Sequence, residues 1–68
     1  VIINYNCKDY VCEDGLIENL ESFANQYDYV YVAPFNGMDA KIALTRLGEI
    51  EVLEEYDFES IKQFIGGR

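Results

Sequence analysis

The stretch that decides the fold is residues 41–53, KIALTRLGEIEVL, in which two runs flank a glycine. Residues 41–47 and 49–53 alternate between apolar and polar side chains, as strands do when one face is buried. Gly48 suits a tight turn between them, because glycine readily adopts the positive φ angles of hairpin turns. The stretch therefore predicts a β-hairpin.

The residues before this hairpin predict a strand, a helix and a second strand. Residues 1–6, VIINYN, have the composition of a buried strand. From Glu13 onward, apolar residues recur at the spacing of one helix face: Leu16, Leu20, Phe23 and Tyr27. We expect Glu13 and Asp14 in the first turn, where carboxylates suit the helix dipole. Residues 29–33, YVYVA, predict a second strand ending at Pro34.

A last helix is expected after the hairpin. Asp57 is predicted to cap it, and Gly66 and Gly67 to end it. Its apolar face would consist of Phe58, Ile61, Phe64 and Ile65. The predicted order is therefore β-α-β-β-β-α. The hairpin must join the sheet of the first two strands, so we expect an α/β fold with a four-stranded mixed sheet and two helices.

Composition restricts the possible functions. The 68 residues are half hydrophobic with one proline, which predicts a single globular domain over residues 1–68. The formal charge of -8 repels phosphate backbones, so nucleic acid is not an expected partner. No run approaches the ~20 apolar residues of a membrane span, and we expect no direct membrane insertion by this segment. Because strand-like residues begin at Val1, without an initiator Met, we expect a processed chain or a fragment of a longer precursor.

The element order resembles the thioredoxin-like domain, most closely over residues 41–65, KIALTRLGEIEVLEEYDFESIKQFI. Cys7 and Cys12 follow the first strand and precede the first helix, as the redox cysteines of that family do. The resemblance implies a minimal thioredoxin-like fold in which a short loop replaces the family's second helix. Two features depart from the family pattern. The cysteine spacing is C-x4-C instead of C-x2-C, and Met38-Asp39 stands where the family has a cis-proline.

A narrower resemblance concerns residues 32–45, VAPFNGMDAKIALT. They are similar to the signature V-x-P-x-x-x-(L/M)-D-x-x-I-x-L-T of an uncharacterised family of archaeal and bacterial domains. Those domains are typically membrane-anchored and face outward, and they have no assigned activity. The family's histidine-containing element has no counterpart here, since the chain has no histidine. The resemblance implies an extracytoplasmic location and a protein partner, within a larger membrane-associated assembly.

Three interpretations of Cys7 and Cys12 stay open. We favour a structural disulfide, which would close a loop of about six residues and contribute roughly 2 kcal/mol. A redox-active dithiol is disfavoured because Asp9, Glu13 and Asp14 would raise the pKa of a thiol. Free thiols, or a metal site made by two thiolates, form the third interpretation. A zinc site with four ligands would need another chain.

The loop of residues 34–39 is the second candidate site. It should emerge beside the cysteine loop, outside the carboxyl ends of parallel strands, where open α/β sheets commonly bind ligands. Its residues are Pro34, Phe35, Asn36, Gly37, Met38 and Asp39. Phe35 and Met38 would form either an exposed contact surface or a cover for the core, and we favour the cover.

The sequence predicts no catalytic residue, cofactor or resident metal. Pairs of serine or cysteine with histidine are impossible without histidine, and the carboxylates match no calcium-loop pattern. We therefore expect a non-enzymatic, extracytoplasmic interaction or accessory domain. A thiol-disulfide oxidoreductase that uses Cys7 and Cys12 is the first alternative, and copper handling through the two thiolates is the second.

Overall fold

A computed structural model describes residues 1–66. The elements in chain order are β1 (Ile2–Tyr5), α1 (Leu16–Gln26), β2 (Tyr31–Pro34), β3 (Ile42–Arg46), β4 (Glu49–Leu53) and α2 (Phe58–Gly66). The predicted order β-α-β-β-β-α is therefore confirmed. Gly66 is the last residue of α2, and Gly67, which was also expected to end this helix, lies outside the described residues.

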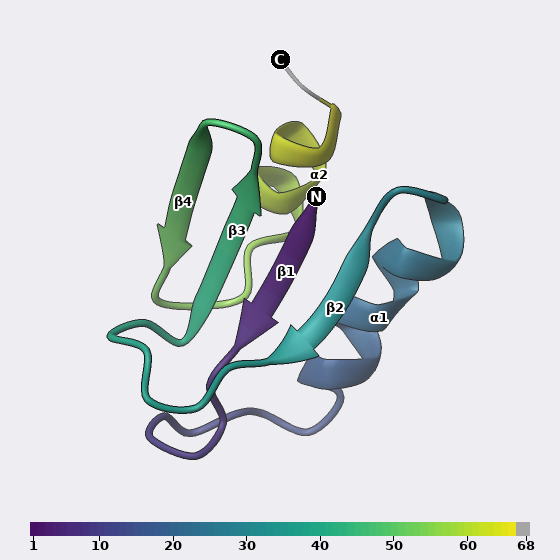
Figure 1. Ribbon diagram of the computed structural model, residues 1–68. Coiled ribbons are helices and arrows are strands. Elements are labelled where there is room, and N and C mark those ends of the chain that lie inside the picture. The colour runs from purple at the N-terminus through teal and green to yellow at the C-terminus, as the bar shows by residue number, and fades with distance from the viewer. Residues whose placement is uncertain (67–68) are drawn as a thin grey trace.

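The four strands form one mixed sheet in the order β2-β1-β3-β4 (Figure 1). β1 pairs in parallel with β2 and antiparallel with β3, and β3 pairs antiparallel with β4. Ile3, at the centre of the sheet, pairs with Val32 on one side and Leu44 on the other. The predicted α/β fold with a four-stranded mixed sheet and two helices is thus confirmed, and it agrees with the minimal arrangement expected from the sequence.

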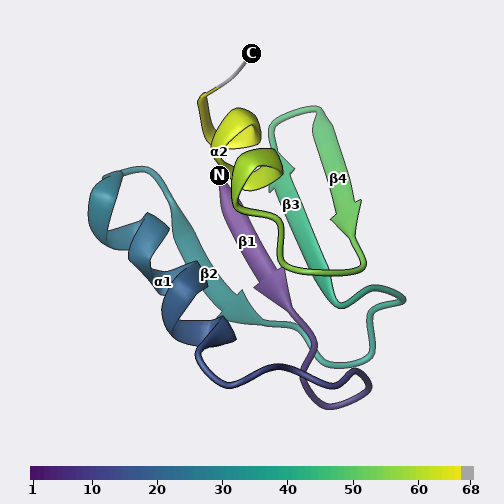
Figure 2. The same ribbon diagram turned by 180° about the vertical axis from the view of Figure 1, so that it is seen from behind.

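Both helices lie on the same face of the sheet, as the two opposite views show (Figures 1 and 2). The hydrophobic core fills the space between this face and the helices. Its members come from β1, α1, β3 and α2, together with one residue directly before β2: Ile3, Leu16, Leu20, Phe23, Val30, Ile42, Leu44, Ile61, Phe64 and Ile65. Within residues 1–66, no helix covers the opposite face. The described chain is therefore a two-layer structure, one layer of helices on one sheet.

The start of α1 differs from the prediction. The helix begins at Leu16, so Glu13 and Asp14 precede its first turn. Gly15 precedes the helix with φ 86°, a left-handed conformation that glycine adopts without steric cost. The side chain of Glu13 is used elsewhere, in an ion pair with Lys41. The acidic residue that does lie in the first turn is Glu18.

Two apolar residues are less buried than predicted. Ile2 in β1 is 44% exposed because it points to the sheet face without helices, so only part of the first strand is buried. Phe58 at the start of α2 is 46% exposed, although its ring lies 5.6 Å from that of Phe23. The cap of α2 is as predicted, since the Ser60 backbone N–H donates to Oδ1 of Asp57 at 3.2 Å.

Candidate functional site

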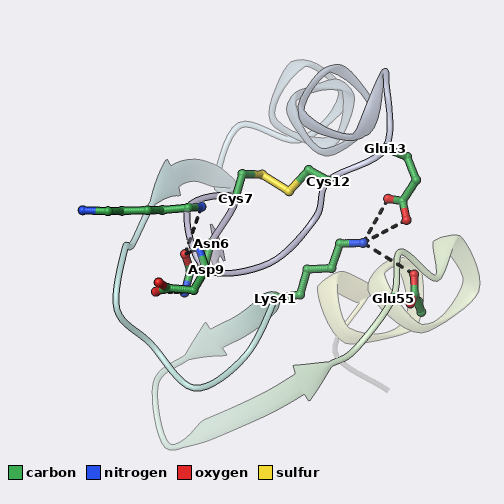
Figure 3. The surroundings of a disulfide bond; sticks show 8 residues. Asn6, Cys7, Asp9, Cys12, Glu13, Lys41 and Glu55 are labelled. Atoms are coloured by element: carbon green, nitrogen blue, oxygen red, sulfur yellow. Dashed lines mark hydrogen bonds and ion pairs between the residues drawn. A yellow bond between two sulfur atoms is a disulfide. The ribbon is translucent and has the colours of Figure 1, made fainter.

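Cys7 and Cys12 form a disulfide bond in the loop between β1 and α1 (Figure 3). Their Cα atoms lie 5.5 Å apart, an ordinary separation for bridged cysteines. Both side chains are half-buried and pack against the hydrophobic core. The predicted pairing of the two cysteines is therefore present, on the side of the loop that faces the protein interior.

Asn6, directly before the first cysteine, organises this loop (Figure 3). Its side chain is fully buried, and its Oδ1 accepts from the backbone N–H groups of Lys8 and Asp9 at 3.2 and 3.1 Å. Its Nδ2 donates to Oδ2 of Asp9 at 3.0 Å and to the carbonyl of Met38 at 2.9 Å. One amide thus shapes the turn after Cys7 and also joins it to the loop after β2.

Asp9 makes the second connection between the same two loops. Its Oδ2 accepts from the backbone N–H of Gly37 at 3.1 Å as well as from Asn6. Gly37 has φ 92°, in the turn that it forms with Asn36. The cysteine loop and residues 35–39 therefore lie side by side at the edge where the parallel strands end, as the expected topology requires.

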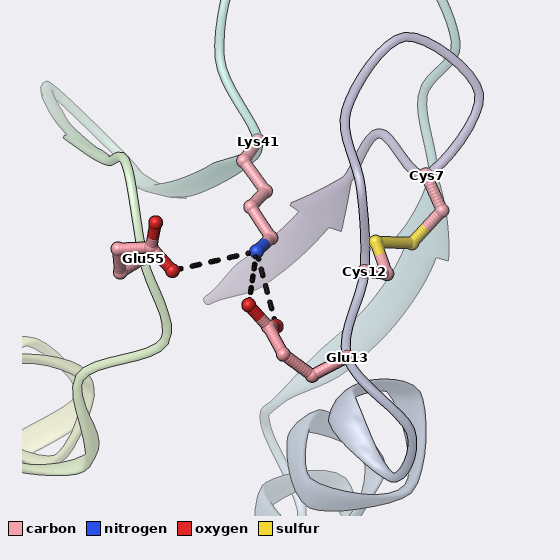
Figure 4. A network of polar contacts seen from close by, with 5 residues as sticks. All are labelled: Cys7, Cys12, Glu13, Lys41 and Glu55. Carbon is pink, nitrogen blue, oxygen red and sulfur yellow. Dashed lines mark hydrogen bonds and ion pairs between the residues drawn. A yellow bond between two sulfur atoms is a disulfide. The ribbon is translucent and has the colours of Figure 1, made fainter.

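Lys41 forms an ion pair at the start of β3 (Figure 4). Its side chain is only 4% exposed, and its Nζ donates to Oε1 and Oε2 of Glu13 at 3.0 and 2.9 Å. A longer contact of 3.5 Å reaches Oε1 of Glu55. The hydrogen bond from Lys41 lowers the pKa of Glu13, and the same bond raises the pKa of Lys41. The residue after Cys12 is therefore linked electrostatically to the sheet.

Neither α1 nor Lys41 is placed to activate a thiol of Cys7 or Cys12. Low thiol pKa values arise at helix N-termini or beside a free cation. Here α1 begins at Leu16, well beyond Cys12, and the ammonium of Lys41 is engaged by Glu13. The carboxylate of Asp9 accepts hydrogen bonds from the side-chain amide of Asn6 and from the backbone N–H of Gly37. These carboxylates have structural contacts that their positions in the sequence do not reveal.

The loop of residues 34–39 only partly matches its prediction. Phe35 is 54% exposed, so the expectation that it covers the core is wrong. Met38 is half-buried, and it contributes its carbonyl oxygen to Asn6. Pro34 is the last residue of β2, an edge strand, where the missing N–H of proline costs no sheet hydrogen bond. Asp39 is exposed. A ligand or partner at this edge stays a prediction.

Two shallow hollows flank the ion pair of Lys41. One is lined by Glu13, Asp14, Leu16, Asn19, Glu55 and Tyr56. The other is lined by residues around Lys41 itself, with Tyr10, Val52 and Glu54 among them. Burial raises the pKa of Tyr56. Within residues 1–66, no group of three or more cysteine, aspartate or glutamate side chains is placed to hold a metal ion.

Sequence reasoning missed Asn6 and Lys41, the two polar residues with the greatest burial. Asn6 is the last residue of one predicted strand and Lys41 is the first residue of another. Polar side chains at the ends of strands usually face water, so nothing in the sequence indicates that these two are buried.

No helix in the described part of the chain has the length and apolar character needed to cross a bilayer. In comparisons with known proteins, no family model, curated protein or solved structure matches this chain.

Proposed function

We propose that this chain is a non-enzymatic interaction domain that functions outside the cytoplasm, held together at one end by the Cys7–Cys12 disulfide. The observation that carries the proposal is the packing of both cysteines against the hydrophobic core. A half-buried crosslink that packs against the core, next to a fully bonded asparagine, stabilises structure, whereas a catalytic disulfide must be open to attack by a thiolate. The domain would use its surface, and not the sulfur atoms, to act.

The location rests on redox chemistry and on the family resemblance. Disulfides persist in oxidising compartments and are rare in the cytosol, and a disulfide is compatible with an extracytoplasmic location. A domain of 68 residues gains from such a crosslink because its core is small. The resemblance of residues 32–45 to outward-facing, membrane-anchored domains points the same way. A protein partner in a membrane-associated assembly is part of this proposal.

The edge formed by the cysteine loop and residues 35–39 is the contact surface that we propose for such a partner. Phe35 supplies an exposed aromatic ring there, of the kind that often anchors protein interfaces. The bonds made by Asn6 and Asp9 hold both loops in one arrangement, so little conformational entropy is lost on binding.

A second candidate function is thiol-disulfide exchange, favoured by the placement of the cysteines between β1 and α1. The two functions predict different reduction potentials. We expect a potential below about -300 mV, which marks a structural bond, while an oxidoreductase would lie between about -270 and -120 mV. The measurement equilibrates the full chain in thiol buffers of set potential and counts alkylated cysteines by mass spectrometry. The Cys7→Ser/Cys12→Ser variant gives the background of the alkylation.

Two further results would contradict the proposal. Native protein trapped with an alkylating agent during extraction should contain no free thiol, and two alkylated cysteines would refute the structural disulfide. Metal analysis of the same sample tests copper handling. One copper ion per chain would support the thiolate metal site, because the sulfur atoms cannot serve as a disulfide and as two thiolates together.

A further inference from the structure

Asn36-Gly37, in the turn after β2, is the one place in the sequence where an asparagine precedes a glycine. The side-chain carbonyl carbon of an asparagine can be attacked by the backbone nitrogen of the next residue, and a side chain on that next residue hinders the attack. Gly37 has no side chain, and even a Cβ built on it would meet nothing within 4 Å. The turn therefore brings together the two groups that this cyclisation needs, without steric hindrance.

The side-chain amide of Asn36 is open to water. Both residues of the turn are exposed, and within residues 1–66 no hydrogen bond involves the Asn36 side chain. The other asparagines are placed differently. Asn4 and Asn6 donate to backbone carbonyls, and Asn19 and Asn25 lie in α1, where helical hydrogen bonds fix the backbone. Asn36 is therefore the asparagine most open to chemical change.

Asp9 restrains the group that would attack. Its Oδ2 accepts from the backbone N–H of Gly37 at 3.1 Å, and the same oxygen accepts from Nδ2 of Asn6 at 3.0 Å (Figure 3). The cyclisation needs the Gly37 nitrogen to lose its proton and to turn towards Cγ of Asn36. A carboxylate is too weak a base to remove this proton, but its hydrogen bond fixes the plane of the peptide. The cysteine loop thus holds the turn in an unreactive arrangement.

We propose that Asn36 is a site of spontaneous deamidation and that Asp9 sets its rate. The Gly37 nitrogen forms a bond to Cγ of Asn36, and the bond from Cγ to the side-chain nitrogen breaks. Ammonia leaves with the proton that Gly37 has lost, and a cyclic imide remains. Water then opens the ring at either of its two carbonyls, which gives aspartate or isoaspartate. Water is the only co-reactant, and nothing is oxidised or reduced.

The reaction changes the edge formed by the cysteine loop and residues 35–39. Either product adds a negative charge beside the Gly37–Asp9 bond, and isoaspartate also lengthens the main chain by one carbon. Because like charges repel, the bond from Gly37 to Asp9 should weaken. Phe35, which is 54% exposed, directly precedes the modified residue. Deamidation would therefore alter this edge permanently, whether or not a partner binds there.

Incubation of the full oxidised chain in mildly alkaline buffer tests the proposal, with peptide mapping by mass spectrometry at intervals. We expect both aspartate and isoaspartate at position 36, and an isoaspartyl methyltransferase identifies the second product. Aspartate without isoaspartate would mean direct hydrolysis of the side chain and would overturn the cyclisation. Conversion of Asn19 or Asn25 as fast as that of Asn36 would overturn the assignment of the site.

Two variants test the control by Asp9. Asp9→Ala removes the acceptor of the Gly37 N–H, so conversion should be about tenfold faster, the population ratio that a hydrogen bond to a charged group maintains. Asp39→Ala is the matched control, because Asp39 is an exposed carboxylate in the same loop and the Gly37 N–H is bonded to Asp9 instead. Equal rates in Asp9→Ala and the parent chain would refute the role of Asp9, as would an equal acceleration in both variants.

Two further measurements separate the loss of this one bond from a loss of folding. Far-UV circular dichroism of Asp9→Ala should match that of the parent chain. Asp9→Asn keeps an oxygen acceptor without the charge, so its rate should lie between those of the parent and Asp9→Ala. The parent chain unfolded in urea gives the rate of an unrestrained turn. Conversion as fast in the folded parent as in urea would show that Asp9 protects nothing, and no conversion at Asn36 in either state would refute the site.

Discussion

Nζ of Lys41 lies 2.9 Å from Oε2 of Glu13, the residue that directly follows Cys12. This ion pair joins the end of the cysteine loop to the start of β3, and its lysine is almost fully buried. A buried ammonium is costly unless it is paired, so the position of this loop depends on the protonation of Glu13.

Stability should therefore depend on pH through this pair. The pKa of Glu13 is lowered by Lys41, so its contribution is present above the ordinary carboxyl value of 4.5 and is lost as the pH falls through the lowered pKa. The pKa of Lys41 is raised, so its contribution is present below 10.5 and is lost as the pH rises through the raised value. Urea denaturation should show Glu13→Gln less stable than the parent at pH 7, with the difference vanishing in acid.

A matched control for this prediction is Glu49→Gln. Glu49 contacts Arg46 at 3.0 Å, but both side chains are more exposed than Lys41, and such pairs contribute little. A loss of stability as large as that of Glu13→Gln would show that burial of the lysine is unimportant. Lys41→Met should change the unfolding free energy by less than about 1 kcal/mol, because the released carboxylates can be hydrated.

Removal of the disulfide should destabilise the domain moderately. The bond joins residues five positions apart, and closing so short a loop contributes about 2 kcal/mol in the chain-entropy model. Cys7→Ser/Cys12→Ser should lower the free energy of unfolding by that amount in urea denaturation. The parent chain treated with a reductant should show the same loss. A fully unfolded reduced chain would mean that the crosslink does more than restrict the unfolded state.

Replacement of Asn6 should lower the free energy of unfolding more than replacement of Asn4, which lies two residues earlier in β1. Asn6→Ala leaves the N–H groups of Lys8 and Asp9 and the carbonyl of Met38 without their partner, so we expect a loss of about 2–3 kcal/mol. Asn4→Ala, at a half-buried position, removes only its bond to Ala33 and should cost less than about 1 kcal/mol. Thermal unfolding of both variants gives the comparison, and equal losses would contradict it.

Two glycine substitutions should have opposite signs. Gly48 has φ 81° in the β3–β4 turn, where alanine is strained, so Gly48→Ala should destabilise by about 1–2 kcal/mol. A Cβ at Gly48 would contact nothing within 4 Å, so the cost would come from the backbone alone. Gly66 lies in α2 with equally open surroundings, and Gly66→Ala should stabilise by about 0.5 kcal/mol. Urea denaturation measures both changes.

The sequence predicts the fold well because its signals are local. The alternation around Gly48, the helical spacing from Leu16 to Phe23 and the cap at Asp57 each depend on neighbouring residues, and all three are found in the structure. The boundaries were predicted less well. β2 begins at Tyr31, two residues later than predicted, because the two residues before it have the same strand-like composition.

The candidate site was less predictable because its contacts join distant parts of the chain. Glu13 and Lys41 are 28 residues apart, and Asn6 and Met38 are 32 apart. From the sequence alone, where those contacts cannot be seen, Glu13 is assigned to the first turn of a helix. The exposure of Ile2 and Ile50 was also outside the reach of pattern reasoning, since alternation shows that a strand has two faces but not which face the helices cover.

The central place of β1 in the sheet also determines how the domain can fold. Ile2 contacts Thr45, 43 residues later, and Asn4 contacts Ala33, 29 residues later. The disulfide and the β3–β4 hairpin need only short-range contacts. Folding rates fall as contacting residues become more distant in sequence. During synthesis, β1 therefore completes its pairing only after β3 has been made, and oxidation of the cysteines can precede that step.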